Sequence, residues 1–432
     1  MSNTTFLGSD PIWANACVGD NGYINYLTYA EGFSKAANLI LDHLLQNNGN
    51  DIDSFIYPVC FNMRHSIELR IKGAIEEIDQ LAKIKELQLP LFNLAGSHDI
   101  GNIWNYFRQN SELLDLRFKD LNDLLDQTII DIAEIDSTGQ TFRYPFDTEN
   151  KKHLTEQRII SCVVLKKKFK ELEENLDSLK YLNELLIEEY QLGTFTSKFS
   201  RAQIFNFAQI LPPIERWKSD LNKEILRSQY SLTSNDLTKI INLVKSNYEI
   251  CSIINIKKNL IALPDELILE ICSIWANKFY PQFRELYTIG LPASSYNLGD
   301  RNDFEKIREY EINKQKVYEI LEPKLNVDLV ADLWSLFYLS RDNMKYSENY
   351  ISSFEYYQKE VKSERSLIDA FNHIFSKSSF LENIIKSLFF LQQLELAEKI
   401  IEKNQLDLYF NFIPDIRSRV TFKKWELLGY NS

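Results

Sequence analysis

Turn-forming residues are scarce in this chain, and that scarcity constrains its fold more than any other feature. Glycine and proline together account for only 24 of the 432 residues (13 and 11), about 6%, where average usage is about 12%. Turns and hairpins consume these residues, so a β-sandwich, a linker-rich chain or a collagen-like repeat is disfavoured. The composition favours long helices with few connections, and we predict an all-α fold.

Apolar residues recur at helical spacing through the first half of the chain. We predict helices over Tyr26–Leu45, from Pro58 as a first-turn proline, and from N-caps at Ser97 and Ser111. Four helices in about 115 residues indicate a four-helix bundle. A long helix over 154–190 is expected to extend this bundle.

A small, polar segment without helical periodicity, Gly193–Ser200, marks the best domain boundary. We therefore expect a helical bundle over residues 1–192 and a second helical domain over 193–432. The second domain is expected to sense, regulate or bind a partner, and its longest loop-like stretch is 289–303.

Several classes of protein are disfavoured by missing features. The N-terminus lacks the charged and apolar regions of a signal peptide, and no apolar run approaches the roughly 20 residues of a membrane span. The five scattered cysteines form no Cys-x-x-Cys pair, which is typical of reduced thiols in the cytoplasm; they are Cys17, Cys60, Cys162, Cys251 and Cys272. Zinc-ligand spacing, phosphate-binding loops and hydrolase motifs are also missing from the sequence. We expect a cytoplasmic protein with no membrane association, metal or cofactor.

The chain is acidic, with 61 acidic against 49 basic residues and a formal net charge of -12. This balance argues against broad, charge-driven binding of nucleic acid but leaves room for a local basic pocket. One small basic cluster with an aromatic residue lies near the C-terminus, at Arg417, Arg419, Lys423, Lys424 and Trp425. An ordinary surface is the favoured interpretation of this cluster, and contact with RNA or an acidic partner is the alternative.

The most informative polar stretch runs from Arg64 through His65 and Glu68 to Lys72. Arg64, Glu68 and Lys72 are each four residues apart, so a helix places them on one face. An internal ladder of ion pairs that braces the bundle is the favoured interpretation, ahead of catalysis. His65 lies one step around the same helix, where a buried, hydrogen-bonded histidine is the ordinary outcome.

Two further polar patches follow. His98 and Asp99 stand where a helix begins, and free backbone N–H groups at such a position favour anions. Arg143 and Tyr144, between Phe142 and Pro145, predict a guanidinium held among aromatic rings. The structural alternatives are a helix cap for His98-Asp99 and a loop anchor for Arg143-Tyr144.

Together these motifs resemble the HEPN superfamily of bacterial helical proteins over about residues 24–150. The residues that carry the resemblance are Phe33, Ala36-Ala37, Arg64-His65-x-x-Glu68-Leu69-x-x-Lys72, His98-Asp99-Ile100 and Phe142-Arg143-Tyr144-Pro145. The resemblance implies a bundle that often forms a homodimer. It also implies a metal-independent ribonuclease or RNA-binding protein of a toxin–antitoxin, abortive-infection or other antiviral defence system, with RNA or a system protein as its partner.

One part of the family pattern is missing. Ribonuclease members carry arginine followed by four to six residues and a histidine, whereas the nearest approaches here, Arg365 to His373 and Arg143 to His153, have seven and nine residues between. A replacement site is one hypothesis, with His98 or His65 as acid and base, Arg64 and Arg143 stabilising charge on the phosphate, and Glu68 and Lys72 orienting them. Asp99 and Tyr144 would then contact substrate. A non-catalytic interaction or regulatory module is the other hypothesis.

Overall fold

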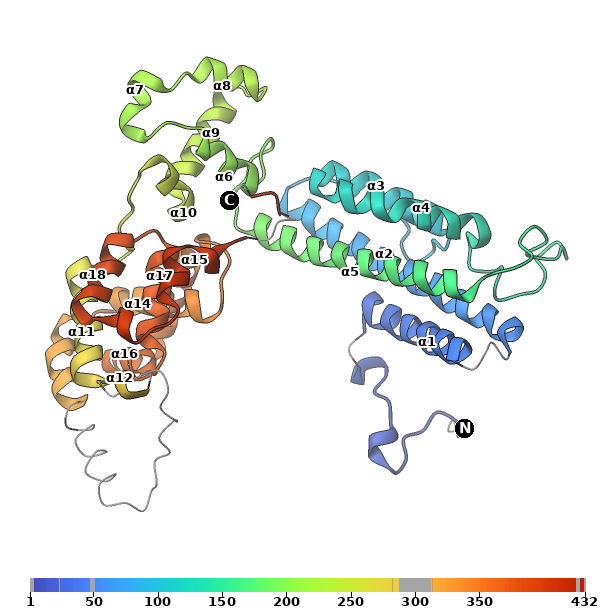
Figure 1. Cartoon of the computed structure of the whole chain (residues 1–432), viewed down its shortest axis with the longest axis horizontal. Coiled ribbons are helices and arrows are strands. Elements are labelled where there is room, and N and C mark those ends of the chain that lie inside the picture. Colours follow the sequence, from blue (N-terminus) through green and yellow to red (C-terminus); the bar gives the residue numbers. More distant parts are fainter. Residues whose placement is uncertain are drawn as a thin grey trace. The chain divides into compact units, whose positions relative to one another are not determined.

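The computed structural model describes residues 4–22, 24–46, 51–281, 283–286, 312, 314–424 and 428–430. These residues form helices joined by loops (Figure 1). Within these ranges the only β-type pairing is an isolated bridge between Phe146 and Lys152. The predicted all-α class is therefore confirmed. The predicted loop at 289–303 and Trp425 lie outside the described residues. The chain divides into two compact units, Met1–Gln191 and Leu192–Ser432.

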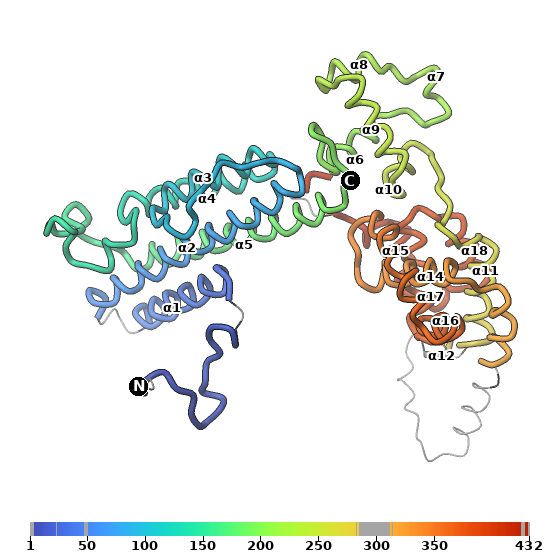
Figure 2. Tube along the Cα trace, turned by 180° about the vertical axis from the view of Figure 1, so that it is seen from behind, coloured from blue at the N-terminus to red at the C-terminus, as the bar shows by residue number. Residues whose placement is uncertain are grey.

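The first unit is built from five long helices, which Figures 1 and 2 show from opposite sides. They are α1 (Tyr26–Gln46), α2 (Ile52–Ile84), α3 (Ile100–Leu114), α4 (Lys119–Asp136) and α5 (Cys162–Gln191). Each of α2, α3, α4 and α5 packs on the next, and α5 packs back on α2, so these four close a ring. In both views α1 lies against α2 and α5, on the side opposite α3 and α4.

The apolar stripe of α2 holds this unit together. Val59, Met63, Ile67, Ile71 and Ile78 recur at helical spacing and are all at most 5% exposed. Burying an aliphatic side chain contributes about 1.5–3 kcal/mol, so each residue of this stripe adds to the stability of the bundle. The predicted inner face of this helix is therefore confirmed.

Two predicted helix starts are wrong by several residues. The second helix begins at Ile52, six residues before Pro58, so Pro58 lies inside the helix and not at its start. The long fifth helix begins at Cys162 rather than near Leu154. Leu154 has a φ of 58°, which is outside the helical region, and the chain from there to Ser161 is a loop.

Both predicted N-caps in the middle of this unit are also wrong. The cap of α3 is Asp99, whose side chain accepts a hydrogen bond from the backbone N–H of Asn102, and not Ser97. Ser111 lies inside α3, where its hydroxyl donates to the carbonyl of Arg108 at 3.1 Å. A serine can bond back to the preceding turn in this way without ending the helix.

The second unit contains shorter helices around two cores. They are α6 (Arg201–Gln209), α7 (Trp217–Asp220), α8 (Lys223–Gln229), α9 (Ser234–Ser246), α10 (Tyr248–Cys251), α11 (Asp265–Ile274), α12 (Phe283–Leu286), α14 (Val327–Arg341), α15 (Glu348–Ser363), α16 (Leu367–Phe375), α17 (Phe380–Phe390), α18 (Leu394–Asn404) and α19 (Ile413–Arg417). The smaller core includes Ile204, Phe207 and Ile240, and the larger one includes Trp334 and Phe337 of α14. No helix among the described ranges is long and apolar enough to cross a membrane.

A cluster of buried charges, the Arg201 cluster, ties together distant segments of the second unit. The Arg201 guanidinium is fully buried and donates to Glu249 at 2.7 Å, to Glu348 at 2.7 and 3.0 Å, and to the Tyr430 hydroxyl at 3.1 Å. Lys424 adds a second cation, with its Nζ 3.1 Å from Glu249. Two cations therefore face two carboxylates.

The Arg201 cluster changes the interpretation of the C-terminal basic residues. The Lys424 side chain is only 8% exposed and is an internal partner of Glu249. Arg417 pairs with Glu398 at 2.6 Å and with Asp407. Of the two neighbouring lysines, Lys423 and Lys424, only Lys423 lies on the surface. The basic residues near the C-terminus therefore do not form one continuous basic patch.

Candidate active site around Glu68

Glu68 lies in the middle of α2, and its buried carboxylate is shared by several basic side chains. Arg64, one turn earlier, pairs with Oε2, and Lys72, one turn later, places its Nζ 2.8 Å from Oε1. All three side chains are at most 4% exposed. Residues four apart meet on one helix face, so the predicted ion ladder is confirmed. We call Arg64, His65, Glu68, Lys72 and His98 the Glu68 cluster.

Arg64 fastens three segments of the bundle to one another. Its Nε donates to the carbonyl of Asp136 at 3.2 Å, and its Nη2 donates to the carbonyls of Ser137, at 2.7 Å, and His98. With Nη1 bound to Glu68, four of the five N–H groups of the guanidinium are engaged. The side chain therefore holds the end of α4 and the start of α3 against α2, and little of it is left for a ligand.

The loop after α4 approaches this guanidinium closely. Gly139 has a φ of 77°, and a Cβ added there would lie 3.2 Å from Arg64 Nη1. The left-handed backbone favours glycine, and the close approach leaves little room for a side chain. This glycine therefore lets the chain turn directly over the Glu68 cluster.

The Glu68 carboxyl is strongly favoured in its ionised form. Burial alone raises its pKa, but the basic neighbours His65, Lys72 and Arg64 outweigh that effect and hold the pKa well below its usual range. A buried carboxylate surrounded in this way stays charged at neutral pH, and it can then orient and stabilise a protonated neighbour.

His98 is the member of the Glu68 cluster that opens to solvent. Its side chain is 62% exposed, and its Nδ1 lies 3.1 Å from Glu68 Oε1. Because an ionised carboxylate only accepts hydrogen bonds, we assign the proton of the neutral ring to Nδ1 and the free lone pair to Nε2. An exposed imidazole backed by a buried carboxylate is the arrangement that general base catalysis uses.

His65 and Arg143 extend the Glu68 cluster through aromatic rings. His65 stacks on Phe61, with ring centres 5.7 Å apart, and its Nδ1 lies 3.8 Å from Glu68 Oε2. The Arg143 guanidinium lies 5.5 Å from the centre of the Phe61 ring and 5.3 Å from that of Tyr144. The prediction that aromatic rings hold Arg143 is confirmed, and Phe61 is the link that joins it to the histidine.

A groove of about 890 Å³ opens beside Arg143, between the first turns of α2 and the segment that follows α4. Its polar and aromatic lining includes Asp53, Tyr57, Arg143, Tyr144, Lys152, His153 and Arg158. Tyr57 and Tyr144 are 47% and 49% exposed. We call this groove the Arg143 groove. Within the described ranges its three cations, Arg143, Lys152 and Arg158, form no ion pair. Exposed rings interleaved with cations that form no ion pair suit the bases and phosphates of a single nucleic-acid strand.

The structure thus brings Arg64, His65, Lys72 and His98 around the Glu68 carboxylate. Asp99 caps α3, whereas Arg143 and Tyr144 lie in the groove wall and not at the carboxylate.

Sequence reasoning missed Gly139, Tyr57 and Arg158. A glycine in a polar loop could have indicated the left-handed turn. In contrast, no pattern of neighbouring residues in the sequence indicates that Tyr57 of α2 and Arg158 of the loop before α5 line the same groove.

Comparison with known proteins adds no relative. No family model matches the chain, and neither a curated protein nor a solved structure matches it. In the part of the chain that the structure describes, no three His, Cys, Asp or Glu side chains are grouped so that they could hold a metal ion.

Proposed function

We propose that this protein is a metal-independent ribonuclease of a bacterial antiviral defence or toxin–antitoxin system. The observation that carries the proposal is the exposed His98 imidazole, whose Nδ1 lies 3.1 Å from the buried Glu68 carboxylate. An imidazole oriented in this way is suited to remove a proton from a ribose 2′-hydroxyl, a step for which general bases contribute about 10²–10⁴-fold.

In the proposed reaction, His98 Nε2 takes the 2′-hydroxyl proton while the 2′-oxygen forms a bond to the adjacent phosphorus. The bond from phosphorus to the 5′-oxygen breaks, and that oxygen receives a proton from His65 or from water. The products are a 2′,3′-cyclic phosphate and a free 5′-hydroxyl. Glu68 stabilises the imidazolium that forms, as the carboxylate of a catalytic triad does.

In this proposal the RNA strand binds in the Arg143 groove. Arg143 stabilises the charge that develops on the phosphate, and Tyr57 and Tyr144 offer faces on which bases stack. Arg64 and Lys72 hold the site in place, because both are buried and bound to Glu68. This division of roles narrows the sequence hypothesis, in which Arg64 also contacted phosphate.

A second function is favoured by a different observation. Four of the five Arg64 N–H groups bind the protein itself, which is the behaviour of a residue that braces a fold. If the whole Glu68 cluster only braces the bundle, the protein is a non-catalytic interaction or regulatory module of the same kind of system. The cytoplasmic location, the protein partner and the homodimer belong to both proposals, and light scattering on the purified chain tests the dimer.

Cleavage of purified total RNA and tRNA in excess EDTA tests the catalytic proposal. The full-length chain is compared with His98→Ala and Arg143→Ala, and with His43→Ala, which removes another exposed histidine of the same unit. We expect wild type and His43→Ala to leave 2′,3′-cyclic phosphate ends, and His98→Ala to lose at least about 100-fold in rate. Circular dichroism checks that each variant is folded. Intact cleavage by His98→Ala, or none by wild type, would leave the interaction module as the better proposal.

A further inference from the structure

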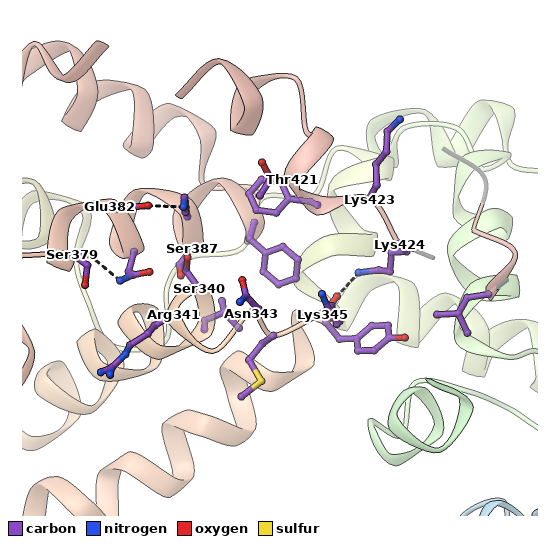
Figure 3. Close-up of a pocket in the computed structure, with 18 residues that line it drawn as sticks. Ser340, Arg341, Asn343, Lys345, Ser379, Glu382, Ser387, Thr421, Lys423 and Lys424 are labelled. Atoms are coloured by element: carbon purple, nitrogen blue, oxygen red, sulfur yellow. Dashed lines mark hydrogen bonds and ion pairs between the residues drawn. The ribbon is translucent and has the colours of Figure 1, made fainter. Parts of the chain in front are cut away.

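A pocket of about 360 Å³ in the second unit is independent of the proposed ribonuclease site (Figure 3). It lies between the end of α14 with its following turn, one face of α17, and residues 421–424 and 428. Pockets that hold small molecules span about 300–1,000 Å³, so this one has the size for a single small molecule rather than a polymer.

The charges around this pocket are unusual for so acidic a chain. Five cationic side chains line it, against a single carboxylate, Glu382; they are Arg341, Lys345, Lys386, Lys423 and Lys424. The formal net charge of the whole chain is -12, so a concentration of positive charge here departs from the average surface. Clefts lined by one sign of charge raise the local concentration of ions of the opposite sign.

Part of this positive charge is already neutralised. Lys386 pairs with Glu382 at 2.6 Å, and Lys424 pairs with Glu249 at 3.1 Å. Lys345, Lys423 and Arg341 form no ion pair within the described residues. All three are exposed, and Lys345 and Lys423 therefore remain to meet an anion, whereas Arg341 already lies over the Phe337 and Tyr338 rings.

Figure 3 shows how these groups are distributed. Lys345 and Lys424, joined by a hydrogen bond from the Lys424 ammonium to the Lys345 carbonyl, lie toward one end, and Arg341 and Ser379 lie toward the other. Arg341 and Lys423 extend outward from the rim. Lys345 and Lys424 are therefore the labelled cations that lie nearest the pocket itself.

Neutral groups at the pocket are also suited to an anion. Ser379 stands at the N-cap of α17, an 11-residue helix, and its side chain makes no capping hydrogen bond. The first turn of a helix favours negative charge, and in α17 Glu382 already supplies one, while the Phe380 N–H donates to the Lys377 carbonyl at 3.0 Å. The hydroxyls of Ser340 and Thr421 and the amide of Asn343 add further donors along the wall.

We propose that this pocket binds a phosphate-bearing small molecule. Phosphate is the expected anion because its several oxygens can use dispersed lysine donors together with hydroxyl and amide groups. The aromatic residues Tyr346, Phe390 and Phe422 also line the pocket, so the phosphate can be free or carried by a flat ring, as in a nucleotide. The second unit is then a ligand-binding unit in its own right.

Isothermal titration of the full-length chain with inorganic pyrophosphate, with ADP and with adenosine tests this proposal. The test variant is Lys345→Glu/Lys423→Glu, which reverses two exposed, unpaired charges. The matched control is Lys359→Glu/Lys403→Glu, which changes the net charge by the same amount at two other exposed lysines of the same unit. Lys424 is not replaced, because it belongs to the Arg201 cluster.

We expect pyrophosphate and ADP to bind the wild type and the control variant, and the test variant to lose at least about tenfold in affinity. Equal affinity for pyrophosphate and ADP would identify phosphate alone as the ligand, and tighter binding of ADP would add the ring. Either result supports the proposal. Binding of neither phosphate compound, adenosine binding as tight as ADP binding, or equal losses in the two double variants would overturn it.

Discussion

Each unit of this protein buries a cluster of charges, and the two clusters differ in how they meet solvent. In the Arg201 cluster, the guanidinium is 0% exposed and the side chains of Glu249, Glu348 and Lys424 are at most 14% exposed. In the Glu68 cluster, the carboxylate is equally buried, but the His98 side chain that contacts it is 62% exposed. One cluster is closed and the other has an open end.

This difference separates two uses of buried charge. A closed cluster must balance its charges internally, because an unpaired ion in the interior is very unfavourable, and the Arg201 cluster does so with two cations and two carboxylates. An open cluster can pass a proton between its buried part and a ligand. The exposed histidine, and not the buried ion pairs, therefore makes the Glu68 cluster a candidate for chemistry.

The largest expected effect comes from breaking the closed cluster. Arg201→Met leaves Glu249 and Glu348 buried without their main partner, and removing one member of a buried pair costs about 3–5 kcal/mol. Hydrogen exchange followed by mass spectrometry should show protection lost across 192–430 and retained in α2 and α5. A cost under about 1 kcal/mol would mean that the cluster contributes little to the stability of its unit.

Acid should weaken the closed cluster in a defined way. Burial raises the pKa of Glu249, but the charges of Lys424 and Arg201 outweigh it and lower the pKa to about 2. The unfolded chain therefore takes up a proton at this group before the folded chain does, and the free energy of unfolding falls as pH decreases from the usual glutamate range toward 2.

Thermal unfolding as a function of pH measures this contribution. Glu249→Gln should be less stable than wild type at neutral pH and approach it as the pH falls. Glu395→Gln is the control, because Glu395 forms only an exposed pair with Lys257 and such pairs contribute little. Parallel pH curves for wild type and Glu249→Gln would contradict the assignment.

An intermediate effect is expected at the turn above the open cluster. Gly139→Ala must adopt a φ of 77° and place a Cβ 3.2 Å from Arg64 Nη1, and such strain costs about 1–3 kcal/mol. Gly193→Ala is a matched control, since Gly193 has a φ of 73° but nothing within 4 Å of the added Cβ. Chemical denaturation gives both costs, and their difference isolates the contact with Arg64. Equal costs would mean that the loop moves away from the guanidinium freely.

The parts of this molecule that could be predicted from sequence are those governed by neighbours along the chain. Arg64, Glu68 and Lys72 are four residues apart, so one helix was enough to place them in a ladder. The apolar stripe of α2 followed from the same periodicity. Helix ends were harder, because Ser97, Asp99 and Ser111 are all residue types that cap helices and only the fold decides which one does.

The contacts that define the candidate site depend on packing between distant segments. His98 reaches Glu68 because Arg64 binds the His98 carbonyl and draws the start of α3 onto α2. Arg143 is expected among aromatic rings, but one of these rings, Phe61, belongs to α2, far from the Arg143 loop in the sequence. Patterns of neighbouring residues do not indicate contacts between distant segments. The residues of the site are therefore easier to predict from sequence than their arrangement.

The smallest stability effect, and the sharpest test of the comparison, is expected at the open end. His98→Ala removes a side chain that is 62% exposed, and substitutions at such positions usually change stability by no more than about 0.5 kcal/mol. Glu68→Gln, in contrast, leaves Arg64 and Lys72 buried without a charged partner and should cost several times more. Chemical denaturation of the two variants measures both changes.

The two variants also separate orientation from structure. If Glu68 acts through His98, Glu68→Gln should lower the kcat of RNA cleavage with little change in KM, because the amide can still position the imidazole but no longer stabilises the positive charge that develops on it. His98→Ala should abolish the activity while the fold stays intact. A His98→Ala protein that is strongly destabilised would show that the imidazole is part of the structural ladder, and the two clusters would then differ in exposure alone.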